Sequence, residues 1–209
     1  MSILAVIFDL GGVVLDSPLE VFLAYERELG IAPHTLNRNI VAAGAAGAWS
    51  RLERGEVAMA EFYRAFDAEM AAAGLTVAGA AIMRRLASAT DVRPAALQAI
   101  RKLRAAGRKV AALTNNWANE DQSSKMDVLR SEFDVFIEST RVGLRKPDPR
   151  IYQLACRELG VEPTQAAFLD DIGLNLKAAR ALGMTTIKVE SLPLALHELE
   201  RVTELALLD

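Results

Sequence analysis

The sequence has little cysteine, no excess of positive charge and no long apolar run. Cys156 is the single cysteine among 209 residues, so an internal disulfide is excluded and we expect a reducing, cytoplasmic location. The formal net charge of -3 offers no basic field for nucleic acid. No segment approaches the ~20 apolar residues of a membrane helix, and the N-terminus lacks the features of a signal peptide. We therefore expect neither nucleic acid nor a membrane as a partner; the oligomeric state is unknown from the sequence.

Short apolar runs rich in β-branched residues recur along the chain, at residues 3–8, 109–113, 133–137, 166–169 and 185–189. Runs of this length are typical of strands that are buried on both faces. Helical patterns at residues 94–106, 149–159 and 175–182 separate most of them, and each pattern ends at a glycine. The alternation predicts an α/β fold, a doubly wound parallel sheet with helices on both faces.

Residues 18–90 break this alternation and contain helical patterns only, at residues 19–29, 35–43, 59–73 and 77–89. We predict an all-helical cap there, inserted after the first strand, with residues 1–17 and 91–209 forming a Rossmann-like core. Ligands of open α/β sheets bind at the carboxyl ends of the strands. The cap leaves the sheet at that end, so it is expected to cover the ligand site.

Polar side chains follow the apolar runs where three of the strands are predicted to end. Asp9 ends the first strand, Thr114 and Asn115 end the second, and Asp170 and Asp171 end the fourth. The carboxyl ends of parallel strands meet at one edge of a sheet, so these residues are expected to share one crevice. Carboxylates that face one another need a cation, and oxygen ligands favour Mg²⁺.

The same crevice has the groups that bind a phosphoryl dianion. Lys146 supplies a fixed positive charge and Thr114 a hydroxyl donor. The main-chain N–H groups of Leu10, Gly11 and Gly12 add further donors, and glycine lets a ligand approach the backbone closely. Asp9 can then attack phosphorus and form an aspartyl-phosphate, which divides one difficult step into two. These residues predict a phosphohydrolase that acts on a small phosphorylated molecule.

Four motifs carry these residues in order: FDLGGVV with Asp9, ALTNN with Thr114, RKPDPRIY with Lys146, and FLDDIGLN with Asp170 and Asp171. In this order, and with a helical insert after the first motif, they resemble the haloacid dehalogenase superfamily. The later motifs are similar to those of the phosphatase-like N-terminal domain of soluble epoxide hydrolases. A similar region precedes some multidomain acyl-CoA dehydrogenases. The resemblance covers the whole chain.

The resemblance implies a role for each matching residue. Asp9 is expected to be nucleophile and metal ligand, Asp171 a direct metal ligand, and Asp170 the group that orients metal-bound water or Lys146. Lys146 is expected to bridge phosphate and Asp9. The remaining implied roles are phosphate binding by Thr114 and Asn115, a metal-binding carbonyl on Gly11, and support of the metal loop by Asn175.

One position departs from the usual pattern of phosphatases in this superfamily. They carry a second aspartate two residues after the nucleophile, as general acid and base, whereas this chain has Gly11. A general acid or base typically contributes about 10²–10⁴-fold, so we expect a slow phosphatase. Two alternatives stay open: a non-catalytic module that binds phosphate and metal, and a metal-free 2-haloacid dehalogenase, against which Asp170 and Asp171 count. Asp16 lies too far along the chain to replace the missing aspartate without rearrangement.

The remaining conspicuous residues are assigned structural roles. Trp49 and Trp117 are expected to pack in the interior, with substrate contact as the alternative. Arg51 and Arg54 are expected to form salt bridges within the cap. Cys156 lies on the apolar stripe of its helical pattern, which predicts an inert core thiol.

Overall fold

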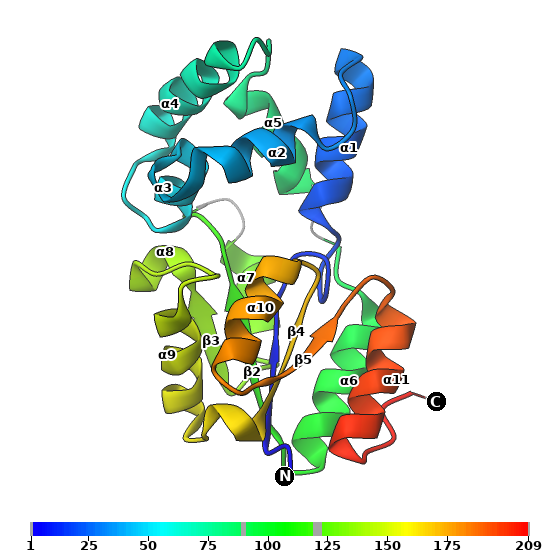
Figure 1. Ribbon diagram of the computed structural model, residues 1–209. Coiled ribbons are helices and arrows are strands. Elements are labelled where there is room, and N and C mark those ends of the chain that lie inside the picture. The colour runs from blue at the N-terminus through cyan, green and yellow to red at the C-terminus, as the bar shows by residue number, and fades with distance from the viewer. Residues whose placement is uncertain (1, 89–90, 119–122, 209) are drawn as a thin grey trace.

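The computed structural model describes residues 2–88, 91–118 and 123–208. Its centre is a parallel five-stranded sheet with the strand order β3-β2-β1-β4-β5 (Figure 1). The first strand is therefore the central one, and Asp9 follows it directly. The bounds of the strands are β1 Ala5–Phe8, β2 Lys109–Thr114, β3 Val135–Glu138, β4 Ala166–Asp170 and β5 Thr185–Lys188.

Helices cover both faces of the sheet, as predicted for a doubly wound fold. On one face α6 (Pro94–Ala105) and α11 (Leu192–Thr203) pack together, and Val6 and Phe8 of β1 point into this layer. On the other face α9 (Pro149–Leu159) and α10 (Gly173–Ala181) pack against the sheet, and the alternate residues Ala5 and Ile7 point toward them. Both faces of β1 are thus buried, because successive side chains alternate between the two layers.

Local sequence signals determine where the helices begin and end. Helix α9 begins at Pro149, after Asp148, whose Oδ1 accepts a hydrogen bond of 2.9 Å from the main-chain N–H of Arg150. It ends at Gly160, which has a left-handed conformation. An N-terminal proline behind an aspartate cap and a C-terminal glycine are strong boundary signals. The predicted bounds of residues 149–159 are therefore confirmed.

A layer of helices stands over the carboxyl ends of the strands (Figure 1). Its members pack on a shared apolar cluster that includes Phe62, Phe66 and Trp49. We call this layer the cap; the boundaries predicted for it, residues 18 and 90, stay a prediction, and residue 90 lies outside the described residues. The cap helices are α1 (Pro18–Leu29), α2 (Thr35–Ala43), α3 (Ala48–Glu53), α4 (Met59–Ala72) and α5 (Gly79–Ser88).

Several elements differ from the predicted ones. Strand β1 begins at Ala5 rather than at residue 3, although Leu4 N–H still donates to Gln165 O over 2.8 Å. The predicted helix at residues 77–89 begins at Gly79, and residue 89 lies outside the described residues. Four helices were not predicted: α3, α11, α7 (Ser123–Arg130) and α8 (Ser139–Val142). Three of them are eight residues or shorter, too short for a periodic pattern to show.

The described residues include no helix that is long and apolar enough to cross a membrane. Cys156 is 3% exposed in the apolar layer beside α10, which confirms the core thiol. Burial raises the pKa of this thiol to about 11, so it is protonated at neutral pH. The cytoplasmic location stays a prediction.

Candidate active site

Asp9 is held by one of its two carboxylate oxygens. Oδ1 accepts a hydrogen bond of 2.7 Å from the N–H of Leu10 and lies 2.7 Å from Nζ of Lys146. Within the described part of the chain, Oδ2 accepts no hydrogen bond. The side chain is buried, and burial raises its pKa well above the usual value, opposed by Lys146. One oxygen is thus fixed while the other remains able to bind or attack a ligand.

Lys146 forms an ion pair with two aspartates at once. Nζ lies 2.7 Å from Asp9 and 2.8 Å from Asp170, and the side chain is only 1% exposed. Burial alone would lower the pKa of this amine, but the two carboxylates outweigh burial and raise it. Lys146 is therefore a permanent positive charge beside the candidate nucleophile.

Asp170 has both of its oxygens occupied by protein donors. Oδ1 accepts 2.7 Å from the N–H of Ile172, Oδ2 accepts from Lys146, and Nδ2 of Asn175 lies 3.0–3.1 Å from both. The side chain is completely buried. These contacts tie Lys146 to the start of α10. They favour the role of orienting Lys146 over direct metal binding for Asp170, and they show how Asn175 supports this loop.

Asp171 completes a cluster of carboxylates. Asp9, Asp170 and Asp171 each offer an oxygen, and these oxygens all lie within 4.8 Å of one another. Asp171 has one long side-chain contact, 3.4 Å from Oγ of Ser17. Burial, with help from Asp170, raises its pKa to about 6. A cation between Asp9 and Asp171 would offset this burial and repulsion, so the donor set fits a hard divalent ion such as Mg²⁺.

The glycines after the nucleophile are required by close packing. Gly12 has a φ of +78°, and a Cβ there would lie 2.3 Å from Oδ2 of Asp171. At Gly11 a Cβ would lie 3.0 Å from Cδ of Pro18, so the proline ring would have to move by a few tenths of an ångström to admit a side chain there. In the described chain, the N–H and C=O of Gly11 form no hydrogen bond. Both groups can therefore contact a ligand or metal, as the sequence predicts for Gly11.

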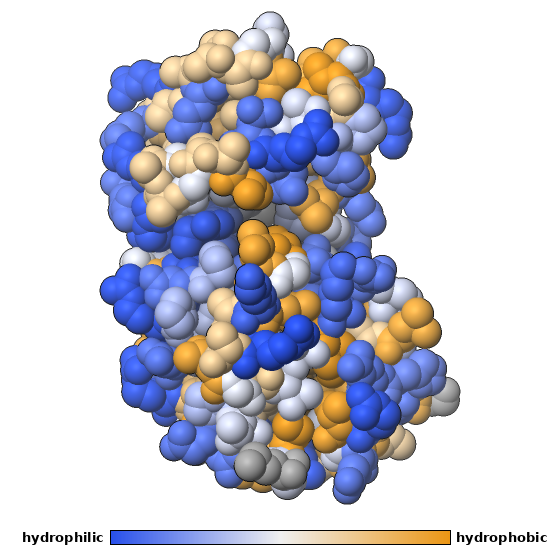
Figure 2. All heavy atoms as spheres, in the orientation of Figure 1, coloured by the Kyte–Doolittle hydropathy of each residue, from blue (hydrophilic) through white to orange (hydrophobic). Residues whose placement is uncertain are grey.

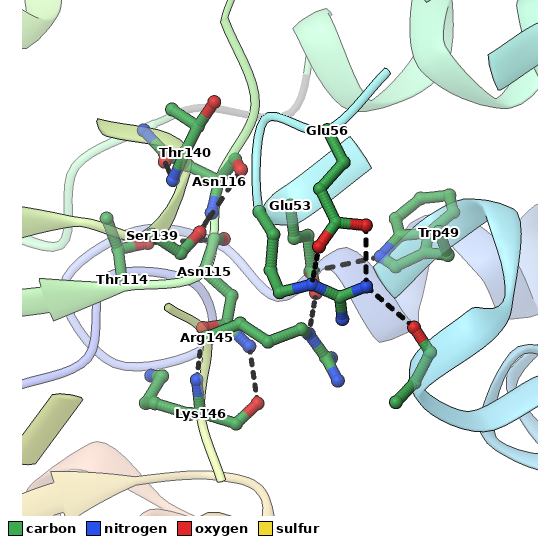
Figure 3. Close-up of polar contacts among 12 residues, drawn as sticks. Trp49, Glu53, Glu56, Thr114, Asn115, Asn116, Ser139, Thr140, Arg145 and Lys146 are labelled. Atoms are coloured by element: carbon green, nitrogen blue, oxygen red, sulfur yellow. Dashed lines mark hydrogen bonds and ion pairs between the residues drawn. The ribbon is translucent and has the colours of Figure 1, made fainter. Parts of the chain in front are cut away.

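The end of β2 brings Thr114 and Asn115 close to Lys146 (Figure 3). Thr114 is buried, and its hydroxyl makes one long contact, 3.4 Å to the carbonyl of Asn115. The amide of Asn115 bonds to the main chain of Lys146, accepting from N over 2.8 Å and donating to O over 3.1 Å. These contacts show that Asn115 positions Lys146; its predicted phosphate contact stays a prediction.

A second polar contact joins the cap to the core. Nε of Arg145 donates to Oε2 of Glu53 in α3 over 2.6 Å, and Nε1 of Trp49 donates to Oε1 of Glu53 over 3.0 Å (Figure 3). A Cβ on Gly55, which has a φ of +69°, would lie 2.7 Å from the carbonyl of Thr140. Cap and core therefore make close contact beside Lys146. Glu53 and Arg145 were not predicted from the sequence to take part in the site.

The residues given structural roles behave largely as predicted. Trp49 and Trp117 pack edge to face, with their ring centroids 5.9 Å apart, within the apolar cluster of the cap. Arg51 pairs with Glu61 over 3.1 Å, and Arg54 pairs with Glu56 over 2.5 Å. Both arginines thus form salt bridges within the cap.

Asp16 does not join the carboxylate cluster. Its Oδ1 lies 3.8 Å from Nε of Arg93, and its side chain is 46% exposed. The three clustered carboxylates are those of Asp9, Asp170 and Asp171. The prediction that Asp16 cannot replace the missing aspartate without rearrangement agrees with this geometry.

The arrangement of sheet, cap and carboxylates matches one family of known proteins. A family model described as haloacid dehalogenase-like hydrolase matches residues 3–183. The chain belongs to the haloacid dehalogenase-like hydrolases. The resemblance seen in the four motifs is therefore confirmed, and this haloacid dehalogenase-like hydrolase is an enzyme by family.

Relatives of this hydrolase include parts of longer proteins. The chain is 38% identical over 199 residues to acyl-CoA dehydrogenase family member 10 of Mus musculus, covering 94% of the chain and 19% of the relative. It is 35% identical over 222 residues to bifunctional epoxide hydrolase 2 of Sus scrofa, covering 100% of the chain and 40% of the relative. The hydrolase thus spans less than half the length of these relatives.

Other similarities include both phosphatases and dehalogenases. The chain is 38% identical over 102 residues to phosphatase MT3486 of Mycobacterium tuberculosis, covering 48% of the chain and 45% of the relative. It is 34% identical over 97 residues to (S)-2-haloacid dehalogenase 4A of Burkholderia cepacia, covering 46% of the chain and 42% of the relative. The fold is shared with a HAD family enzyme of Bacteroides thetaiotaomicron in complex with magnesium and inorganic phosphate, at 24% identity and a TM-score of 0.59, covering 90% of this chain and 94% of that one.

Proposed function

We propose that this hydrolase is a Mg²⁺-dependent phosphatase of small phosphomonoesters, with Asp9 as the nucleophile. The observation that carries the proposal is the state of the Asp9 carboxylate. Oδ1 is fixed by Lys146 and by the N–H of Leu10, Oδ2 has no partner among the described residues, and the carboxyl group as a whole belongs to the carboxylate cluster. The phosphatase relative, and the magnesium and phosphate held by a protein of the same fold, support the same chemistry.

The chain supplies most groups of a two-step transfer. Oδ2 of Asp9 attacks phosphorus, the ester P–O bond breaks, and water then hydrolyses the aspartyl-phosphate. Lys146, the hydroxyl of Thr114 and the N–H of Gly11 bind the phosphoryl oxygens. Asp9, Asp171 and the carbonyl of Gly11 would hold Mg²⁺, which supplies positive charge beside those oxygens; Asp170 keeps Lys146 in place.

Proton transfer to the leaving group is the weak part of the site. Gly11 has no carboxyl group, and the ring of Pro18 fills the space beside it. An aryl phosphate needs little help from an acid because its leaving group is stable as an anion. We therefore expect aryl phosphates to be hydrolysed about 10²-fold faster than alkyl phosphates, a ratio within the usual contribution of a general acid.

Phosphate release from an aryl phosphate tests the proposal. Purified protein should release phosphate with Mg²⁺ and stop when the metal is chelated. Release that persists under chelation would contradict the metal dependence. Binding of a fluoride mimic of phosphate without any hydrolysis on a broad substrate panel would instead favour the non-catalytic module.

A 2-haloacid dehalogenase is the second candidate, since relatives of that activity match and Gly11 replaces the acid of the phosphatases. The carboxylate pair of Asp170 and Asp171 beside Asp9 weighs against it, because a metal-free dehalogenase has no need of clustered carboxylates. Halide release from 2-chloropropionate without metal decides between the two. We expect none.

Binding of Mg²⁺ should weaken as the pH falls below about 6, the pKa of Asp171 in the folded chain. The proton and the metal compete for the same carboxylate, so the half-saturating Mg²⁺ concentration should rise by about tenfold per pH unit below this value. Without metal, protonated Asp171 contributes to the stability of the fold at low pH, because its pKa is higher in the folded chain than in the unfolded one. This contribution to the free energy of unfolding is lost as the pH rises from about 4 to about 6. Titrations of activity with Mg²⁺ at pH 5 and pH 7.5 measure the effect.

Asp171→Asn is the matched control for this pH dependence, because asparagine does not titrate. The variant should bind Mg²⁺ weakly at both pH values, with a smaller difference between them. A wild-type affinity that is equal at pH 5 and pH 7.5 would contradict metal binding by Asp171.

A further inference from the structure

Arg145 presents an unused set of hydrogen-bond donors beside the phosphate site. It directly precedes Lys146, and its side chain is 26% exposed. Nε donates to Glu53, whereas the two terminal nitrogens form no hydrogen bond with the residues that the structure describes. A partly buried guanidinium that is fixed at Nε and unpaired at its outer edge is well suited to bind a ligand oxyanion, because that edge matches a carboxylate or phosphate in two parallel hydrogen bonds.

Glu53 fixes the direction of this guanidinium from the cap. Its side chain is 8% exposed, and both of its oxygens are occupied, Oε2 by Arg145 and Oε1 by Trp49. The indole of Trp49 is itself held edge-on by Phe22, with ring centroids 5.4 Å apart, and by Phe62 at 5.7 Å. The carboxylate of Glu53 therefore has little freedom to rotate, and its hydrogen bond to Nε fixes the orientation of the Arg145 guanidinium.

Residues of the core fix the main chain next to Arg145. The amide of Asn115 bonds to both main-chain groups of Lys146, so the backbone beside Arg145 cannot shift without breaking those bonds. Figure 3 shows the guanidinium between Lys146 and the cap helix that carries Trp49. The charge of Lys146 acts on Glu53, so this pair lies in the electrostatic field of the phosphate site.

The described surface at the start of α10 is apolar and carries no positive charge that could bind an anion as Arg145 can. Figure 2 shows apolar side chains at the start of α10, below a hollow under the cap. Ile172 and Leu174, which begin that segment, are 42% and 56% exposed. A charged group of the substrate is therefore expected on the Arg145 side of the site.

We propose that Arg145 is a specificity residue that binds a second oxyanion, a carboxylate or a second phosphate, in the leaving group of the substrate. This inference rests on the proposed phosphatase function. The substrate class is then a phosphomonoester with a second acidic group, such as a phosphorylated hydroxy acid or a bisphosphate. A neutral leaving group would leave the donors of Arg145 desolvated and unpaired, which disfavours sugar and lipid monoesters without a further charge.

Matched aryl esters test the inference, because they differ only in the second group. The substrates are phenyl phosphate, carboxyphenyl phosphate and phenylene bisphosphate, each compared by kcat/KM in wild-type protein and in Arg145→Met. The variant should lose about tenfold to a hundredfold on the esters that carry a second anion, the range for a hydrogen bond to a charged group. It should change less than about twofold on phenyl phosphate, which makes no such bond. The two anionic esters distinguish a carboxylate site from a second phosphate site.

Two further variants separate binding from structure. Glu53→Gln keeps the shape of the side chain but removes its charge, so it should raise KM for the anionic esters and leave kcat nearly unchanged. Arg150→Met is the control, because Arg150 is 69% exposed and its one ion-pair partner in the described part of the chain is Asp148. It should lower none of the three activities. An equal loss on all three esters in Arg145→Met, or no loss on any, would overturn the inference.

A binding measurement keeps this result apart from failure of the proposed function. In the Asp9→Asn background, calorimetry with Mg²⁺ reports the affinity of carboxyphenyl phosphate without turnover. Arg145→Met should weaken this binding by tenfold or more and leave binding of phenyl phosphate unchanged. If wild-type protein hydrolyses none of the esters but this difference is found, the phosphatase proposal fails and the oxyanion site stands. If the affinities do not differ, the oxyanion site fails.

Discussion

Replacing Asp9 with asparagine is expected to reduce phosphate release by about a thousandfold or more. The amide cannot act as the nucleophile, and the two-step route through a covalent intermediate is lost with it. The fold should survive, because the carboxylate that asparagine replaces is destabilised by burial, as its raised pKa indicates. The expected result is therefore a stable, inactive protein, measured by kcat on an aryl phosphate and by thermal unfolding.

Asp16→Asn is the matched control for that variant. Asp16 lies on the same segment, seven residues later, but its side chain is 46% exposed and lies near Arg93. We expect near wild-type activity from it. If Asp9→Asn kept more than a tenth of the wild-type activity, or Asp16→Asn lost as much as Asp9→Asn, the assignment of the nucleophile would be wrong.

Replacing Lys146 with methionine should impair both stability and activity. The amine is the shared partner of Asp9 and Asp170, and its removal leaves two buried carboxylates without a positive charge. Breaking a buried ion pair on one side costs about 3–5 kcal/mol of unfolding free energy. Activity should fall by about 10²–10³-fold, as when a transition-state donor is removed.

The pH dependence of this loss identifies its cause. The pKa of buried Asp9 is raised already and rises further without the lysine, so Asp9 binds a proton more readily at pH 5 and the destabilisation should be smaller there than at pH 8. Lys188→Met is the control, because Lys188 is 52% exposed and, among the described residues, pairs only with Glu190 at the surface. That variant should change stability by less than about 1 kcal/mol. A Lys146→Met protein as stable as wild type at pH 8 would show that the buried pair is not formed as described.

The core of the fold could be predicted because its signals are local. Strands buried on both faces appear as apolar runs, and α9 has a cap at both ends, so its bounds were predicted without error. Helix α11 was not predicted, although Leu192, Leu196 and Leu199 all lie in the core. Its start has a serine N-cap and a proline in the first turn, but its C-cap is Glu204 rather than a glycine, so the glycine that marks the end of α9 is missing here.

The residues of the candidate site also fall into those that a local sequence pattern reveals and those that it does not. Residues at strand ends could be found because parallel strands bring them together, which accounts for Asp9, Thr114 and Asp171. The contact between Glu53 and Arg145 joins residues 92 positions apart on two different layers. No local pattern marks it. The absence of a carboxylate at position 11 was visible in the sequence, but the ring of Pro18 that takes up the space was not.

The covalent intermediate on Asp9 is the most direct test of the central claim. Protein mixed with an aryl phosphate and Mg²⁺ is stopped with acid within the first turnovers, digested, and its peptides are weighed by mass spectrometry. The account predicts one added phosphoryl group on the peptide that contains Asp9, absent after chelation of the metal and absent in Asp9→Asn. Steady phosphate release with no phosphoryl group on that peptide at any time, or with the group on another residue, would contradict it.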